Sequence, residues 1–150
     1  MKKTILLTQN EIAIAADILK KGGVIAFPTE TVFGFGVVFD NHDAYQTLLE
    51  IKRHREHKPF TLMCADVDDI ANYAVVDEKV HRLINTFMPG PLTLILPAKK
   101  NLPSWVSSSS SMIGIRISNL KLVRDLIRAT GKPLLVPSAN RSNEPPALTH

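Results

Sequence analysis

The chain has 150 residues, of which 45% are hydrophobic and 21% are charged, and this predicts one soluble globular domain over residues 1–150 with a core of its own. The single cysteine, Cys64, excludes an intrachain disulfide and a thiolate metal cluster, and it favours a reducing, cytoplasmic setting. A net charge of +4 favours an anionic partner but does not identify it.

The first residues contain a short apolar run, Ile5–Leu7, after two lysines. This run is too short for a secretion signal, and no stretch of the chain approaches the length of a membrane span. We therefore expect a cytoplasmic protein with no membrane contact. Behind the run, Thr8 and Glu11 have the spacing of a capping box, which predicts the start of a helix that ends at Gly22-Gly23.

The rest of the chain alternates between short apolar runs and amphipathic segments. Apolar runs bounded by turn residues predict strands, whereas apolar residues spaced three and four apart predict helices. The alternation predicts an α/β sandwich with a largely buried sheet. In chain order we expect a strand at 24–27, a helix at 42–52, a strand at 60–64, helices at 66–73 and 78–87, strands at 92–96 and 113–117, a helix at 120–129 and a strand at 134–136.

Four polar groups follow or interrupt these strands, at positions where α/β proteins commonly bind ligands. The first is PTETVFGFG, residues 28–36, in which Gly34-Phe35-Gly36 would let backbone amides approach an anion closely. The segment lacks the third glycine of a dinucleotide fingerprint. An ordinary turn and a binding site are equal alternatives for it.

The second group is KRHREHKP, residues 52–59, which packs Lys52, Arg53, Arg55 and Lys58 around two histidines. It is either a solvated helix end, whose cations favour the helix dipole, or a pocket wall that binds phosphate. Exposed ion pairs contribute only about 0–1 kcal/mol each, so stability does not explain so dense a cluster. The apolar strand that follows holds the cluster near the sheet, which favours the pocket.

The third and fourth groups lie on the last two predicted strands. Arg116 stands alone in the apolar run GIRIS, so it pairs either with a ligand carboxylate or phosphate or with an internal Asp or Glu. Ser138, Asn140 and Ser142 alternate in VPSANRS just past a buried strand. For each residue alone, hydrogen bonds within a turn are the better explanation, but that explanation is weaker for the three together, which could converge on a ligand.

Other site chemistries lack their motifs. The sequence has no GxSxG elbow, no HExxH and no Walker A pattern, and its five histidines lack zinc spacing. We therefore predict no metal site built by the protein. Cys64 lies within an apolar run, which predicts a core residue rather than a nucleophile.

Taken in order, these groups resemble the YrdC-type domain of the threonylcarbamoyl-AMP synthase family. The matching pieces are PTETVFGFG (28–36), IKRHREHKPFTLM (51–63), MPGPLTLIL (88–96), GIRIS (114–118) and VPSANRSNEPP (136–146). The resemblance implies a single-domain open twisted sheet with flanking helices and a concave basic cavity. It also implies that the chain lacks the C-terminal segment that family members usually carry beyond this point.

The resemblance implies an L-threonylcarbamoyladenylate synthase, a nucleotidyltransferase that makes threonylcarbamoyl-AMP and pyrophosphate from L-threonine, bicarbonate and ATP. The product serves threonylcarbamoyladenosine modification of tRNA, so tRNA-modification proteins are expected partners. ATP is a substrate, and Mg²⁺ is expected to accompany it. A YciO-like paralogue and a non-catalytic module that binds double-stranded RNA or tRNA remain alternatives.

The resemblance also implies roles for single residues. Thr31, Arg116 and Ser138 would bind threonine, and Arg116 would hold its carboxylate. The nucleotide would be bound by Lys52, Arg53, Arg55, Lys58, Ser138 and Asn140, with Lys52 and Arg55 acting on the phosphates as the catalytic pair.

Three positions depart from the family pattern. His54 stands at the second position of the family's KxR element when the chain is aligned on Lys52 and Pro59. A shift by one gives Arg53-His54-Arg55, which resembles the hydrogenase-maturation carbamoyltransferases, a further alternative that the single cysteine disfavours. Met63 replaces a histidine of some synthases, and Ser118 replaces the usual proline after the arginine.

Overall fold

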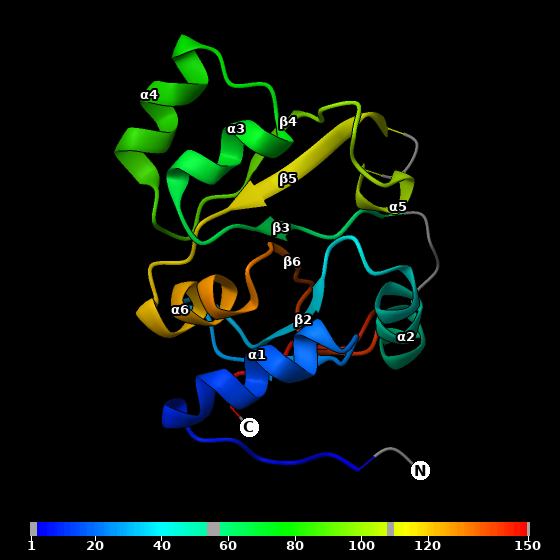
Figure 1. Cartoon of the computed structure of the whole chain (residues 1–150). Helices are drawn as coiled ribbons and strands as arrows, with labels where there is room; N and C mark the ends of the chain where they lie inside the picture. Colours follow the sequence, from blue (N-terminus) through cyan, green and yellow to red (C-terminus); the bar gives the residue numbers. More distant parts are fainter. Residues whose placement is uncertain (1–2, 54–57, 108–109, 150) are drawn as a thin grey trace.

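The computed structural model describes residues 3–53, 58–107 and 110–149, which form one six-stranded sheet with helices on both faces (Figure 1). Neighbouring strands are antiparallel except for β3 and β5, which run parallel. The sheet is therefore open and mixed, with β1 and β4 at its edges. In the order β1-β2-β6-β3-β5-β4, the strands are Ile25–Phe27, Gly34–Val38, Leu134–Leu135, Leu62–Met63, Met112–Arg116 and Leu94–Pro97.

The helices begin and end close to the positions that local sequence signals predict. Thr8 donates its backbone N–H to Glu11 Oε2 at 2.6 Å, as in the expected capping box. The Asp77 carboxylate accepts from the Val80 N–H at 2.8 Å, and Gly131 ends a helix with φ of 80°. The helices are η1 Gln9–Glu11, α1 Ile12–Lys20, α2 His42–Lys52, η2 Val67–Asp69, α3 Ile70–Tyr73, α4 Glu78–Phe87, α5 Ser104–Ser107 and α6 Lys121–Thr130.

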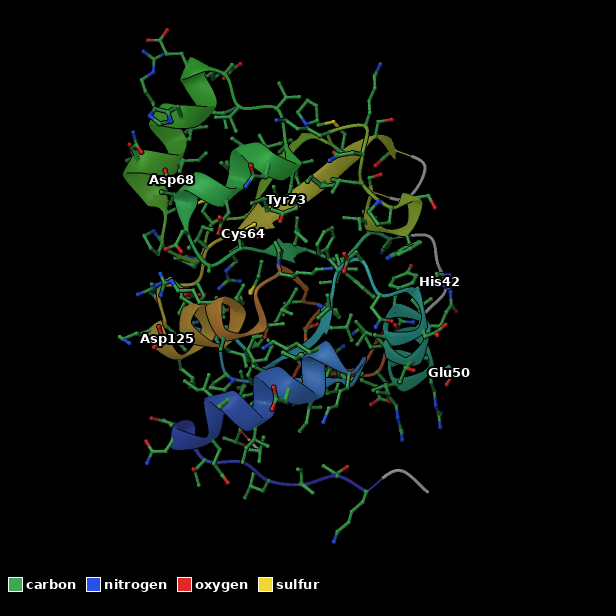
Figure 2. The ribbon with its side chains drawn as sticks, viewed as in Figure 1. His42, Glu50, Cys64, Asp68, Tyr73 and Asp125 are labelled. Carbon is green, nitrogen blue, oxygen red and sulfur yellow. The ribbon has the colours of Figure 1, made fainter. Side chains whose placement is uncertain are left out.

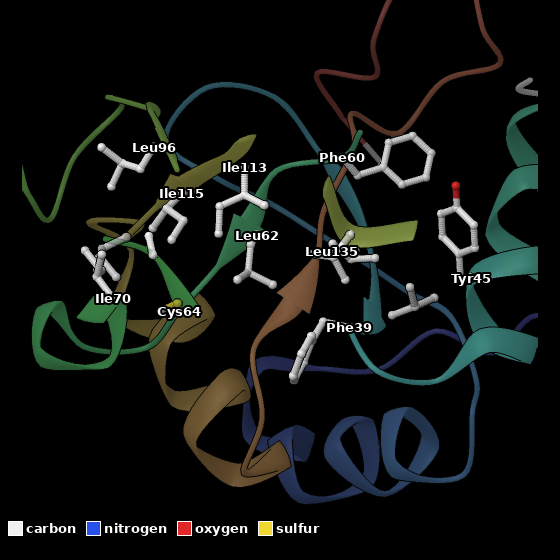
Figure 3. Close-up of a cluster of buried hydrophobic side chains, with 14 of the residues drawn as sticks. Phe39, Tyr45, Phe60, Leu62, Cys64, Ile70, Leu96, Ile113, Ile115 and Leu135 are labelled. Atoms are coloured by element: carbon white, nitrogen blue, oxygen red, sulfur yellow. The ribbon is translucent and has the colours of Figure 1, made fainter. Parts of the chain in front are cut away.

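The larger hydrophobic core lies on one face of the sheet, beneath α2, α3, α4 and α5. Leu62, Ile115 and Leu135 point into it from three adjacent strands, and Tyr45 packs against it from α2 (Figure 3). Cys64 is fully buried in this core, and burial, with the nearby negative charge of Asp69, raises the pKa of its thiol to about 12. The prediction that Cys64 is a core residue is therefore confirmed. Figure 2 shows it inside the fold, whereas Glu50 and Asp68 lie at the surface.

A second core lies on the opposite face, where α1 and α6 pack against each other and against the sheet. Successive strand residues alternate between the two cores: Leu62 enters the first and Met63 the second, and Leu135 and Leu134 do the same. This alternation follows from the period of two along a strand. Because both faces are covered here, these strands read as continuous apolar runs in the sequence.

The described helices do not show a membrane span, since none of them is long and apolar enough to cross a bilayer.

Residues Gly34–Val38 form strand β2, so Gly34-Phe35-Gly36 is not the turn or anion-binding loop that the sequence predicts. Gly34 and Gly36 pair with Phe27 and Ile25 of β1 in an antiparallel ladder. A Cβ at Gly36 would lie 2.6 Å from Phe27 Cε1, and one at Gly34 would lie 2.6 Å from Val136 Cγ1. These glycines therefore allow a close approach of neighbouring side chains, which is a tertiary requirement that a local pattern does not reveal.

Candidate functional site

A cavity of about 430 Å³ opens where the predicted polar groups meet. Its volume lies within the range typical of small-molecule sites. Four segments far apart in the sequence contribute to it: the residues after β1, the end of α2 with the start of β3, Arg116 of β5, and the loop after β6. The lining residues are Thr29, Thr31, Val32, Phe33, Gly34, Lys52, Lys58, Pro59, Phe60, Thr61, Met63, Arg116, Val136, Pro137, Ser138, Asn140, Ser142 and Asn143.

The sheet explains why Arg116 reaches this cavity. Arg116 is the last residue of β5 and is the register partner of Met63 on β3. Met63 points to the face that carries the second core, and its neighbour Leu62 points to the first. Paired residues of adjacent strands project to the same face, so Arg116 shares the face of Met63.

Arg116 is held by a buried ion pair. Its Nη2 donates to Glu30 Oε1, and the two side chains are only 12% and 10% exposed. The same Nη2 lies 3.3 Å from Thr31 Oγ1. Burial lowers the pKa of Arg116, and its buried Nε–H has no hydrogen-bond partner among the described residues. Of the two alternatives that the sequence left open, the structure shows the internal ion pair with Glu30; Arg116 also lines the cavity, and its role as a ligand-binding residue stays a prediction.

The segment after β1 is ordered by its own hydroxyls. Thr29 Oγ1 donates to the Val32 carbonyl at 2.6 Å and accepts from the Thr31 N–H at 3.2 Å. The Thr29 and Thr31 hydroxyls lie 3.0 Å apart. This turn points Thr31 towards Arg116 and leaves it exposed at the cavity. Glu30, between the two threonines, was not singled out as a site residue from the sequence, although an acid within PTET was the available signal.

Lys52 is buried, although it belongs to the basic segment. It is the last residue of α2 and is 4% exposed. Its ammonium donates to the backbone carbonyls of Ser138 at 2.6 Å and Asn140 at 2.8 Å, and it lies 3.4 Å from Asn140 Oδ1. Burial lowers the pKa of Lys52. The lysine therefore ties the end of α2 to the loop after β6.

The loop after β6 is closed by its own polar side chains. Ser138 Oγ donates to Asn140 Oδ1, and Asn140 Nδ2 donates to the carbonyls of Arg141 and Glu144, each at 2.8 Å. The Ser142 N–H donates to the Lys52 carbonyl at 2.8 Å. Ser138 and Asn140 thus form hydrogen bonds within the loop, as one of the two interpretations of this segment predicts. Both residues also line the cavity, and ligand binding by them stays a prediction.

The remaining basic residues are placed differently from one another. Lys58 is exposed and lines the cavity. Arg53 ends α2 in a left-handed conformation with φ of 49°, is exposed, and is not among the lining residues. Arg55 and His54 lie outside the described residues, as do Glu56 and His57.

The described lining carries three cationic side chains, those of Lys52, Lys58 and Arg116, and no carboxylate. Hydroxyls and amides make up most of its other polar groups. The described residues also contain no group of three or more His, Cys, Asp or Glu side chains arranged to hold a metal ion. This arrangement suits an anionic ligand with hydroxyl or amide groups of its own.

Comparison with known proteins links the chain to one family. The sequence model of the Sua5/YciO/YrdC family, described as "Telomere recombination", matches residues 17–150. A protein of Enterobacter sp. (strain 638) named threonylcarbamoyl-AMP synthase is 36% identical over 141 residues, which is 92% of this chain and 74% of that protein.

Two solved structures share the fold. The crystal structure of Sua5 from P. abyssi in complex with L-threonine matches with a TM-score of 0.88 and 29% identity, over 95% of this chain and 42% of that one. The E. coli YciO structure matches with a TM-score of 0.80 and 30% identity, over 89% of this chain and 65% of that one. The chain thus spans about three quarters of the Enterobacter protein and less than half of the Sua5 chain.

Proposed function

Because this chain belongs to the Sua5/YciO/YrdC family, we propose that it is a threonylcarbamoyl-AMP synthase. It would join L-threonine, bicarbonate and ATP into threonylcarbamoyl-AMP and release pyrophosphate and water. The observation that carries the proposal is the meeting of Thr31, Lys52, Arg116, Ser138 and Asn140 around one cavity. The L-threonine complex of the P. abyssi Sua5 structure supports the choice of amino acid.

The threonine end of the cavity is assigned to Arg116 and Thr31. Arg116 offers a planar guanidinium, which suits the substrate carboxylate better than a point charge does. Thr31 lies 3.3 Å from Arg116 Nη2 and presents a hydroxyl at the cavity, within reach of a ligand bound to Arg116. Ser138 would close this end from the loop after β6.

The phosphate end is assigned to the basic segment and the loop it touches. Lys58 lines the cavity and is exposed, so its ammonium is free to follow a phosphate. Lys52 would add a fixed positive charge, and Ser138 and Asn140 would contribute polar groups from the loop it holds. We propose that Arg53 and Arg55 also bind the nucleotide, and that Lys52 and Arg55 act on its phosphates as the catalytic pair.

The proposed reaction needs the cationic side chains to stabilise negative charge, and none of them forms a covalent bond with a substrate. Threonine and bicarbonate give N-carboxythreonine and water, and a carboxylate oxygen of this carbamate attacks the α-phosphorus of ATP. The bond from the α-phosphorus to the bridging oxygen breaks, and pyrophosphate leaves with the electron pair. Fixed cations stabilise the charge that develops on the phosphate oxygens. Because they are already in position, they do not have to reorganise during the reaction.

Mg²⁺ is assigned to the nucleotide rather than to the protein. The described lining offers no carboxylate, and Mg²⁺ in nucleotide sites is commonly bound by phosphates and waters with few protein ligands. When bound it would neutralise part of the phosphate charge. The product would pass to tRNA-modification proteins, which transfer the threonylcarbamoyl group to adenosine in tRNA.

The direct test is pyrophosphate release by the purified protein with ATP, bicarbonate and labelled threonine. We expect release that requires all three substrates, and a labelled product that carries both threonine and AMP. Arg116→Ala should reduce release strongly at a threonine concentration near the wild-type KM. The matched control is Arg82→Ala, because Arg82 is an exposed arginine on α4 and does not line the cavity. Folded protein with no threonine-dependent release contradicts the proposal.

Replacement of bicarbonate by carbamoyl phosphate distinguishes the proposed synthase from a hydrogenase-maturation carbamoyltransferase. A threonylcarbamoyl-AMP synthase should make no adenylate from carbamoyl phosphate and ATP in the absence of threonine. Adenylate formation under those conditions would support the carbamoyltransferase alternative instead.

A second candidate is a non-catalytic module that binds double-stranded RNA or tRNA. It is favoured by Arg53, which is exposed beside the cavity without lining it and so is available to a larger anionic partner. Binding through several phosphates should weaken steeply with salt, by about one counterion per contact. Titration of duplex RNA or tRNA at several salt concentrations tests this candidate, and an undetectable or salt-insensitive affinity contradicts it.

A further inference from the structure

We propose that Glu30 is a positioning residue for Arg116 and that Ser118 holds Glu30 in place. This inference rests on the proposed function to the extent that Arg116 binds the threonine carboxylate. Glu30 contacts Arg116 but is not among the residues that line the cavity, whereas Arg116 and Thr31 are. It therefore acts from behind the arginine and does not compete with a ligand inside the cavity.

Both oxygens of the Glu30 carboxylate are occupied. Oε1 accepts from Arg116 Nη2, and Oε2 accepts from Ser118 Oγ at 2.9 Å and from the Asn119 backbone N–H at 2.5 Å. The carboxylate thus connects the turn after β1 to the residues directly after β5. One carboxylate with three donors is a charge-assisted network, which fixes the positions of its members more strongly than a single pair does.

Burial makes this pair necessary for the orientation of Arg116. The side chains of Arg116 and Glu30 are 12% and 10% exposed, and a buried charge without its partner is strongly unfavourable. The pair therefore stays formed, and it directs Nη2 to Glu30 and Thr31. The Nε–H is also buried and has no partner among the described residues, so the described hydrogen bonds orient the guanidinium through Nη2.

Ser118 completes the network from the strand end. It is fully buried, its hydroxyl donates to Glu30 and accepts from the Leu120 N–H at 3.2 Å, and its carbonyl accepts from Arg124 Nη1 at 2.8 Å. The hydroxyl is thus the connection between Glu30 and the start of α6. An alanine at 118 would remove both hydroxyl contacts and leave the backbone carbonyl contact intact.

Glu30→Gln is the sharpest probe because the amide has the shape of the carboxylate. One of its two ends is an NH₂ group, and it must face either Arg116 Nη2 or the donors of Ser118 and Asn119. Either orientation sets a donor against a donor and also leaves the Arg116 charge unbalanced. The variant therefore releases Arg116 without a change in side-chain volume.

The experiment measures the KM values for threonine and ATP in pyrophosphate release by wild type, Glu30→Gln and Ser118→Ala. We expect Glu30→Gln to raise the threonine KM by about tenfold or more and the ATP KM by less than about twofold, with Ser118→Ala in the same direction but weaker. Glu78→Gln is the charge-matched control, since Glu78 is exposed on α4. In an Arg116→Lys background, Glu30→Gln should add much less to the threonine KM.

Equal rises in both KM values, or none, would overturn the positioning role. A wild-type protein without threonine-dependent release would count against the proposed function instead, and a second readout then decides the inference. NMR of the Arg116 side chain should show slow guanidinium rotation in wild type and fast rotation in Glu30→Gln. The same rotation rate in both proteins would overturn the inference whether or not the protein is active.

Discussion

The ammonium of Lys52 lies 2.6 Å from the backbone carbonyl oxygen of Ser138, a residue 86 positions further along the chain. With its second carbonyl contact, to Asn140 at 2.8 Å, it joins the basic segment to the loop after β6. A side chain that looks in the sequence like one of several surface cations is therefore an internal connection. It gives the two halves of the proposed phosphate site a fixed relative position.

We expect Lys52→Met to lower the free energy of unfolding by about 2–3 kcal/mol. Methionine keeps the apolar stem, but the carbonyls of Ser138 and Asn140 lose a charged donor, and such hydrogen bonds contribute about 1.5–3 kcal/mol. Urea unfolding measures the change. Lys100→Met is the matched control, because Lys100 is exposed and outside the cavity. Equal stability of the two variants would contradict the internal role of Lys52.

Arg116 and Lys58 should affect the two substrates differently. Arg116→Ala removes the proposed carboxylate ligand, so threonine affinity should fall by about tenfold to a hundredfold, the equivalent of about 1.5–3 kcal/mol, while ATP affinity changes less. Lys58→Ala should weaken ATP and leave threonine nearly unchanged. Calorimetric titration of each ligand separately provides both affinities.

Arg116→Ala also leaves Glu30 without its partner, so the folded state of that variant must be checked by circular dichroism. Arg116→Lys keeps the charge but loses the planar fork, and it should weaken threonine in the same direction. Equal losses of both ligands in either arginine variant would contradict the assigned roles.

Local signals in the sequence predicted α1, α2, α4 and α6 well, because caps and apolar spacing are local properties. Helix α5 was not predicted, and the helix expected at 66–73 is divided into η2 and α3. Residues 42–52 form α2 and residues 78–87 form α4, both with the predicted bounds. Strand β2 was not predicted, because two glycines this close together indicate a turn in the sequence. Their actual role is to make room for the Phe27 ring and Val136, which only the fold brings next to them. Strand β3 is also shorter than the apolar run that predicted it.

The candidate site was predictable as a set and less so in its contacts. Residues in four segments were expected to converge, and Thr31, Lys52, Lys58, Arg116, Ser138 and Asn140 do line one cavity. The partner of Arg116 could not be chosen, since Glu30 lies 86 residues earlier and only the fold brings the two together. The burial of Lys52 could not be predicted either, because its partners Ser138 and Asn140 lie 86 and 88 residues later in the chain.

Gly36→Ala tests the packing explanation for the glycines of β2. The new methyl group would meet Phe27 Cε1 at 2.6 Å and Leu134 Cδ1 at 3.2 Å, both in a buried part of the sheet. Overpacking of this kind costs about 1–3 kcal/mol of unfolding free energy, which urea unfolding can measure. Phe27→Leu in the same chain should recover part of the loss. If the double variant loses the sum of both single losses, the clash with Phe27 is not the cause.

The buried thiol of Cys64 should make stability fall at high pH. Burial and the charge of Asp69 raise its pKa from 9.0 to about 12, so the folded state keeps a proton that the unfolded state releases above pH 9.0. A folded pKa above the unfolded value means that stability is complete below the unfolded pKa and decreases as pH rises towards the folded pKa, by up to about 1.4 kcal/mol per pH unit.

Urea unfolding of wild type and Cys64→Ala at about pH 8, 9 and 10 tests this contribution, because the two proteins differ in no titratable group except the Cys64 thiol. The alanine variant is less stable at about pH 8, since it leaves a small cavity in the core. Its disadvantage should shrink above pH 9.0, where only the wild type has the thiol that ionises on unfolding. A difference between the two proteins that stays constant over this range would mean that the Cys64 thiol titrates alike in the folded and unfolded chains.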